Sequence, residues 1–302
     1  MASAGSIRRN MPVRALVLGY PKVGKTGALA PLVNAGFKLR ILDYDGNLEP
    51  LFLYADPAKM DANVDILQLE DRMRYKEGEG LMPIGIPTAF TEGLQAMDKW
   101  KYRDENGNAV DLGASRDWGP DTIMVLDSLT AHGQAALNWA MVLANKTPST
   151  TTDRVYNLAI GAQVRFIKEL TSTNNHFHVL VLTHIRMIAP RDLRKGDSEI
   201  AQQVKKEIAS LVDTRLYPNA LGYQWPQEIG GEFPTIIQVK SEERAGRTKR
   251  YITAKSRAEL DLGIPALDLP DELDIKDGML RIFQALSPAS VAMVQEAQKE
   301  KA

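Results

Sequence analysis

The stretch GYPKVGKT, residues 19–26, constrains the fold of this chain more than any other feature of its sequence. It follows the apolar run VRALVL and precedes GALAPLVNAG, a segment with the pattern of a helix. Glycines at Gly19 and Gly24 allow the backbone to curl so that its N–H groups turn inward. A strand, a glycine-rich curl and a helix N-terminus in this order form a site for phosphate groups.

The spacing Gly19-x-x-x-x-Gly24-Lys25-Thr26 matches the P-loop of nucleotide-binding proteins. Lys25 is expected to place its charge on the β- and γ-phosphates of ATP, and the Thr26 hydroxyl is placed to ligate Mg²⁺. The alternative is a glycine-rich turn with a solvated lysine, which would not need the strand and helix on either side. The expected ATP-contacting residues of the loop are Gly19, Tyr20, Pro21, Lys22, Val23, Gly24, Lys25, Thr26 and Gly27.

Short apolar runs that alternate with helical patterns predict an α/β fold with a mostly parallel central sheet flanked by helices. The expected strands are 13–18, 37–43, 64–69, 121–127 and 178–184. The expected helices are 26–35, 88–102, 129–145 and 154–172, with a polar loop over 102–119. Near the C-terminus, 235–240 and 249–255 flank the polar segment SEERAGRT and predict an antiparallel hairpin.

Composition limits the class of protein. The 302 residues include no cysteine, which excludes disulfides and cysteine-ligated zinc and fits a reducing cytoplasm. No stretch has the length of a membrane span, so no membrane partner is expected. The net charge of −1 does not indicate a globally basic nucleic-acid binder, so such binding would use local patches.

An acidic side chain at the end of a neighbouring strand usually completes a nucleotide-bound Mg²⁺ site. The run TIMVLD ends in Asp127, which we interpret as this residue, although an acid can also simply end a strand. The next residue is Ser128, whereas ATPases of the AAA+ type commonly carry a glutamate there to polarise the attacking water. The catalytic base is therefore expected elsewhere in this chain.

The second apolar strand offers such a base. It runs into ILDYDGNLEPL, which contains Asp43, Asp45 and Glu49. This segment resembles RecA-like P-loop ATPases, in which the strand after the P-loop helix ends in an acidic stretch that carries the catalytic carboxylate. The resemblance assigns that role to Asp45, with an acidic surface turn as the alternative. Many members use glutamate, so the shorter aspartate is a departure that is expected to slow hydrolysis.

The strand HVLVLTH ends with Thr183 and His184. RecA-like proteins carry a polar residue here that senses the γ-phosphate and relays its state to a DNA-binding loop, and a Thr-His ending resembles the phage members of that group. The resemblance implies a catalytic role for His184, whose imidazole can donate to a phosphate oxygen. A histidine that only caps the strand is the alternative.

The segment after His184 lines the DNA path in RecA-like folds. Here it is rich in cations, with acidic residues interleaved, and a solvated loop and helix face is the alternative. Basic side chains on such a loop can neutralise DNA phosphates without reading sequence. The candidate nucleic-acid contacts are Arg186, Arg191, Arg194, Lys195, Lys205 and Lys206.

The segment YITAKSRAEL places Lys255 and Arg257 at the end of a strand and on one face. In RecA-like rings and filaments such a pair reaches the nucleotide of the adjacent subunit and stabilises charge on the γ-phosphate. The resemblance therefore implies a catalytic role in trans for both residues and a homo-oligomer, either ring or filament. A surface basic pair is the alternative.

The resemblance covers residues 12–260, which we interpret as a RecA-like core between a flexible N-terminus, 1–11, and a partly helical C-terminal extension, 261–302. Within the RecA-like group the chain is most similar to the compact phage-encoded ATPases that promote single-strand annealing and recombination. The resemblance implies a Mg²⁺-dependent ATPase that acts on single-stranded DNA in the host cytoplasm, with a single-strand-binding protein as a possible partner.

Two other activities remain open at this point. A helicase-like or loader ATPase would share every motif above and would differ in forming closed rings and separating strands. A small-molecule or nucleotide kinase would need an acceptor site and an arginine-bearing lid, for which RDLRKGD is a candidate. A GTPase is disfavoured because the sequence lacks an Asn-Lys-x-Asp segment that reads guanine.

Overall fold

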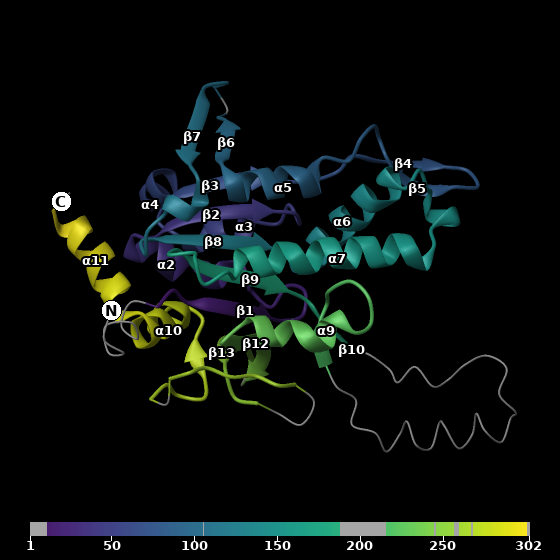
Figure 1. Ribbon diagram of the computed structural model, residues 1–302. Helices are drawn as coiled ribbons and strands as arrows, with labels where there is room; N and C mark the ends of the chain where they lie inside the picture. The colour runs from purple at the N-terminus through teal and green to yellow at the C-terminus, as the bar shows by residue number, and fades with distance from the viewer. Residues whose placement is uncertain are drawn as a thin grey trace, which may run out of the picture.

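The computed structural model describes residues 11–104, 106–187, 216–244, 246–256, 260–266 and 268–300. Its centre is an 8-stranded sheet with the order β14-β13-β12-β1-β9-β8-β2-β3 (Figure 1). The strands of this sheet are β1 (Arg14–Leu18), β2 (Lys38–Asp43), β3 (Val64–Gln68), β8 (Thr122–Asp127), β9 (His178–Thr183), β12 (Thr235–Arg244), β13 (Arg247–Thr253) and β14 (Leu273–Asp274).

Most strands of the central sheet are parallel to their neighbours. β1 pairs in parallel with β12 and β9, β8 pairs in parallel with β9 and β2, and β2 pairs in parallel with β3. β13 runs antiparallel to both β12 and β14. Every residue of β1, β8 and β9 is buried, as expected for parallel strands covered on both faces. The predicted α/β class, with a mostly parallel sheet and a C-terminal antiparallel hairpin, is confirmed.

Helices cover both faces of the sheet (Figure 1). One hydrophobic cluster joins the sheet to α5 (Ala89–Asp98), α6 (Leu129–Leu143), α7 (Asp153–Leu170) and α9 (Trp225–Glu228). The other joins it to α2 (Ala30–Ala35), α3 (Glu49–Tyr54), α4 (Pro57–Asn63), α10 (Gly278–Leu286) and α11 (Pro288–Lys299). Successive residues of β1 alternate between these clusters, because side chains on a strand point to opposite faces.

In the described ranges, three two-stranded antiparallel sheets lie outside the central sheet. They are β4 (Met73–Lys76) with β5 (Gly80–Pro83), β6 (Trp100–Arg103) with β7 (Ala109–Gly113), and β10 (Ile185–Met187) with β11 (Leu216–Pro218). The expected helix over 88–102 ends at Asp98, and much of the expected polar loop over 102–119 is strand. The buried Trp100 ring, 5.7 Å from that of Trp118, fixes this hairpin.

Two predicted elements differ in detail. The helix expected over 26–35 begins as the 3₁₀ turn Gly27–Leu29 and continues as α2, ending at Gly36 with φ 102°. The hairpin strands are longer than expected, since Arg244 already pairs with Arg247 and the turn includes Gly246 with φ 72°. The residues SEER therefore belong to β12 rather than to a loop.

The C-terminal segment packs against the core. β14 adds a strand beside β13, and Phe283 of α10 meets Phe37 with ring centroids 5.4 Å apart. None of the helices in the described ranges is long and apolar enough to cross a bilayer.

Candidate functional site

The P-loop connects β1 to the first helical turn. The Gly19 N–H donates to the Thr183 carbonyl at 3.2 Å, which ties the start of the loop to the end of β9. A Cβ on Gly19 would lie 2.8 Å from Val23 Cγ2, and Gly24 adopts φ 103°. Both positions therefore require glycine. Lys22 also has a positive φ, of 64°, which places it at the bend of the curl.

Lys25 points back into its own loop. Its ammonium group donates to the carbonyl oxygens of Gly19 and Tyr20, each at 3.1 Å, and lies 3.2 Å from His184 Nδ1. The side chain is buried, and this burial lowers its pKa, while the carboxylates of Asp127 and Asp45 act in the opposite direction. Uncharged carbonyl oxygens therefore hold the Lys25 ammonium group inside the curl, where an anion would be a stronger acceptor.

Thr26 and Asp127 meet across the loop. The Thr26 hydroxyl donates to Asp127 Oδ2 at 2.8 Å, and Asp127 is 4% exposed at the end of β8. Burial raises the pKa of Asp127 to about 7, with Asp45 and Asp43 adding to the rise and the Thr26 hydroxyl opposing it. The geometry therefore brings together the two side chains expected to contact Mg²⁺.

The donor set fits Mg²⁺ rather than a metal held wholly by protein. Within the described ranges, no three His, Asp or Glu side chains gather as a metal cluster. Mg²⁺ commonly takes one or two protein oxygens and completes its shell with substrate phosphates and water. One hydroxyl and one carboxylate beside the P-loop match that pattern.

The three acids after β2 lie in different surroundings. Asp43 is buried, and its Oδ1 accepts from the backbone N–H groups of Asp45 at 3.2 Å and Gly46 at 2.8 Å, so it fixes the turn. Asp45 points toward the P-loop side, with Oδ2 3.9 Å from His184 Nε2. Glu49 is exposed at the start of α3. The geometry favours Asp45 over the other two as the acid that faces a bound phosphate.

His184 lies between Lys25 and Asp45. Burial and the neighbouring charge of Lys25 lower its pKa, so the ring is neutral at pH 7. Because the Lys25 ammonium can only donate, Nδ1 must accept and Nε2 must carry the proton that faces Asp45. The His184 N–H is 3.5 Å from the Thr130 hydroxyl, which itself donates to the Asn219 carbonyl at 3.1 Å.

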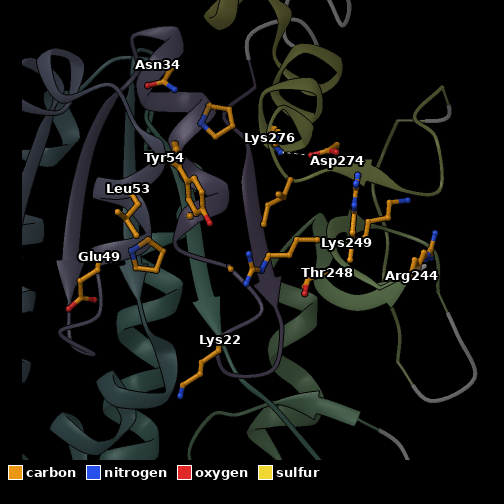
Figure 2. Close-up of a pocket in the computed structure, with 18 residues that line it drawn as sticks. Lys22, Asn34, Glu49, Leu53, Tyr54, Arg244, Thr248, Lys249, Asp274 and Lys276 are labelled. Carbon is orange, nitrogen blue, oxygen red and sulfur yellow. Dashed lines mark hydrogen bonds between the residues drawn. The ribbon is translucent and has the colours of Figure 1, made fainter.

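A cavity of 1110 Å³ opens beside the P-loop (Figure 2). One wall is α2 and α3, with Leu53 and Tyr54, and the other is β13, with Thr248 and Lys249. The Tyr54 ring lies against the loop, because a Cβ on Gly27 would be 3.0 Å from its Cδ2. The cavity could not be expected from the sequence, because α3 spans only six residues and shows no helical period.

Arg250 of β13 also reaches the P-loop and was missed by the sequence analysis. A Cβ on Gly24 would lie 3.3 Å from Arg250 Cδ. The segment KRYITAK had marked Arg250 only as a strand residue, and nothing in the local sequence indicates that it faces a loop more than two hundred residues earlier.

The remaining predicted cations fall into two groups. Arg186 donates to the Gly222 carbonyl, and Lys255 pairs with Asp271 at 2.6 Å on an exposed surface. The other predicted positions lie outside the described residues: Arg191, Arg194, Lys195, Lys205, Lys206 and Arg257.

Comparisons with known proteins add little beyond this geometry. No protein-family model matches the sequence, and no curated protein matches it. A KaiC-like protein of Pyrococcus horikoshii OT3 aligns over 82% of this chain and 85% of its own, with 10% identity and a TM-score of 0.34. The flagellar accessory protein FlaH of Methanocaldococcus jannaschii aligns over 84% of each chain, with 8% identity and a TM-score of 0.30.

The P-loop between β1 and its helix and the acids at the ends of β8 and β2 lie together at the carboxyl edge of a mostly parallel α/β sheet, as in P-loop nucleotide-binding folds.

Proposed function

We propose that the chain binds ATP·Mg²⁺ in the P-loop and hydrolyses it. One observation carries this proposal: Lys25, Thr26–Asp127, Asp45 and His184 converge at the carboxyl ends of β1, β8, β2 and β9. In parallel α/β sheets, ligands bind at this edge. Phosphoryl transfer to water requires hydrogen-bond donors for the phosphates, oxygen ligands for the metal and a carboxylate for the attacking water. Lys25 and His184 offer the donors, Thr26 and Asp127 offer the metal ligands, and Asp45 offers the carboxylate.

Each residue then has a distinct role. Lys25 exchanges its bonds to the Gly19 and Tyr20 carbonyls for phosphate oxygens, which are stronger, charged acceptors. Thr26 and Asp127 hold Mg²⁺, which supplies positive charge to the phosphate oxygens. Asp45 orients the attacking water and accepts its proton, and His184 directs its Nε2 proton toward the same space.

The cavity beside the loop is the proposed site of the nucleoside. It borders Gly24 and Gly27, so a nucleotide whose phosphates lie in the curl would extend its sugar and base into it. Tyr54, Pro50 and Leu53 offer a flat apolar wall on which a purine ring can pack.

We further propose that hydrolysis serves work on single-stranded DNA, in phage recombination or strand annealing in the host cytoplasm. The support is the sequence resemblance to phage RecA-like ATPases, together with the cation-rich segment that follows His184. On this proposal the working form is a ring or filament of identical subunits, and a single-strand-binding protein is a candidate partner.

A product assay tests both levels of the proposal. Radiolabelled ATP and Mg²⁺ are incubated with the protein, with and without single-stranded DNA, and products are separated by thin-layer chromatography. ADP and free phosphate are expected, with faster release when single-stranded DNA is present. ADP formed at one rate in both samples would support the ATPase and contradict the DNA step, whereas transfer to an added acceptor would indicate a kinase.

A further inference from the structure

Arg250 has no carboxylate partner among the described residues, unlike Arg244 and Lys249 of the same hairpin. Arg244 pairs with Glu242 and Glu272, each at 2.9 Å, and Lys249 pairs with Glu272 at 2.8 Å. Within the described ranges, Arg250 makes no ion pair, although it lies next to Lys249 in the same strand. Acidic side chains therefore neutralise Arg244 and Lys249, whereas Arg250, the hairpin cation that lies against Gly24 of the P-loop, has no such partner.

Arg250 also lacks the backbone partners that two comparable arginines have. Among the described residues, three arginines bury an Nε that has no hydrogen-bond partner: Arg14, Arg186 and Arg250. Arg14 compensates by donating from Nη2 to the Ser172 carbonyl, and Arg186 does so to the Gly222 carbonyl. In the described part of the chain, the Arg250 guanidinium makes no such bond. A buried N–H without an acceptor is costly, and a phosphate oxygen that accepted from Nε would remove that cost.

The position of Arg250 identifies the ligand. A Cβ on Gly24 would lie 3.3 Å from Arg250 Cδ and 3.8 Å from its Nε, so the side chain lies against the glycine that shapes the phosphate curl. The same Cβ would lie 3.0 Å from Ile275 Cδ1, so Ile275 also lies against this glycine. The guanidinium thus faces the seam between the P-loop and the cavity.

The other charged side chains that line the cavity are also mostly positive. Its lining includes six cationic side chains against two acidic ones, Glu49 and Asp274. Besides Arg250, the cations Lys22, Arg247 and Lys276 are without an ion pair among the described residues. This excess of positive charge suits a ligand that carries several negative charges at the P-loop end of the cavity.

We infer that Arg250 binds the phosphate chain of the nucleotide within its own subunit, from the β13 side of the P-loop. Lys25 and His184 approach from the β9 side, so the chain would be held between two sets of donors. A guanidinium offers paired N–H groups that match phosphate oxygens, which a lysine cannot reproduce. The inference rests on the proposed ATP binding and adds a residue to it.

Calorimetric titration of the full chain with ATP and with ADP, in the presence of Mg²⁺, tests this inference. Arg250→Ala is expected to raise the Kd of both nucleotides about tenfold or more, the scale of a charge-assisted hydrogen bond. Arg250→Lys should recover part of the loss. The control is Arg281→Ala, which removes an exposed arginine from α10 and should leave both Kd values unchanged.

Different results would overturn the proposed ATP binding and the proposed role of Arg250. A wild-type protein that binds neither nucleotide would overturn the proposed function itself. A wild-type protein that binds ATP, with Arg250→Ala within twofold of it, would overturn only the role of Arg250. If the alanine variant does not fold, Arg250→Met keeps the packing on Gly24 and Ile275 and must show the same loss of affinity.

Steady-state kinetics give a second test, because a purely structural role of Arg250 would not change KM and kcat in the pattern expected for a phosphate contact. Removal of a ground-state phosphate contact should raise KM about tenfold and leave kcat within about threefold of wild type. A large loss of kcat at unchanged KM would contradict the inference, because it would place Arg250 in the transition state instead.

Discussion

The ammonium group of Lys25 lies 3.2 Å from Nδ1 of His184, and the opposite ring nitrogen of that histidine lies 3.9 Å from Asp45. One neutral imidazole therefore separates the cation of the P-loop from the carboxylate that follows β2. The first contact must break if Lys25 is to reach a phosphate group. His184 is then free to turn its protonated nitrogen toward the ligand.

Lys25→Ala is expected to abolish ATP binding, because it removes the positive charge that the triphosphate meets inside the curl. His184→Ala should leave the Kd for ATP within about tenfold of wild type and lower turnover about 10-fold to 100-fold, since its donor acts on charge that develops later. Calorimetry and a phosphate-release assay separate the two effects. Unchanged ATP affinity in Lys25→Ala, with the surface variant Lys299→Ala as control, would rule out the proposed role of the loop.

Asp45→Asn is expected to keep ATP bound and to lower turnover about 10²-fold or more, the usual scale for loss of a general base. The amide is nearly isosteric with the carboxylate but cannot accept a proton from water. Asp61→Asn is the matched control and should turn over normally, because Asp61 is exposed on α4 and does not line the cavity. The assignment to Asp45 fails if the two variants lose activity in the opposite order.

Thr26→Ala should raise the Mg²⁺ concentration needed for half-maximal turnover about tenfold or more, while Thr26→Ser should stay near wild type. Serine keeps the hydroxyl that donates to Asp127 at 2.8 Å and that can ligate the metal. A titration of turnover against Mg²⁺ at saturating ATP gives the comparison. Equal Mg²⁺ dependence in all three proteins would remove Thr26 from the metal site.

The local part of this site could be predicted from sequence, because the P-loop and the acids at strand ends are fixed by short-range rules. Gly24 needs a positive φ, and Asp127 follows an apolar run. The buried strands were recognisable for the same reason, since both their faces are apolar. The helices α3 and α4 were missed because each spans only six or seven residues, too few to show a helical period.

The distant part of the site could not be predicted. Arg250 reaches Gly24 because β13 folds back beside β12. No local pattern encodes such a contact. Likewise, the sequence predicted only a partly helical extension over 261–302 and did not indicate that Phe283 packs against Phe37 and His178 in the core.

Activity is expected to depend on contact between subunits if Arg257 acts on the nucleotide of a neighbour. Turnover per subunit should then rise with protein concentration and with single-stranded DNA, which gathers subunits on one strand. Arg257→Ala should bind ATP almost normally and lose roughly 10³-fold in turnover, because an arginine finger acts mainly on the transition state.

A mixing experiment separates action in trans from action in cis. Arg257→Ala and Lys25→Ala are each expected to be inactive alone. In mixed oligomers, interfaces that pair an intact P-loop with an intact Arg257 should recover part of the activity. Mixed oligomers without recovery, verified by two affinity tags, would mean that Arg257 does not act across the interface.

The stability of the protein should fall in mild acid because of His132. This ring is buried in the core, with Phe166 and Tyr44 at centroid distances of 4.2 and 5.1 Å, and its Nε2 has no hydrogen-bond partner among the described residues. Burial lowers the pKa of His132 to about 3, from an ordinary value of 6.5. Below pH 6.5 the unfolded chain therefore gains a proton that the folded chain does not take up.

His132→Phe isolates this effect, because it keeps an aromatic ring in the same apolar site and removes the titrating group. The free energy of unfolding is measured by urea denaturation at pH 7.5 and at pH 5. Any packing difference between the two side chains shifts both values equally, and the titration of His178 and Asp127 is common to both proteins. Between these pH values the wild type should lose about 2 kcal/mol more than the variant, at roughly 1.4 kcal/mol per pH unit below 6.5. Parallel losses in the two proteins would show that His132 either is protonated in the folded state or does not titrate on unfolding.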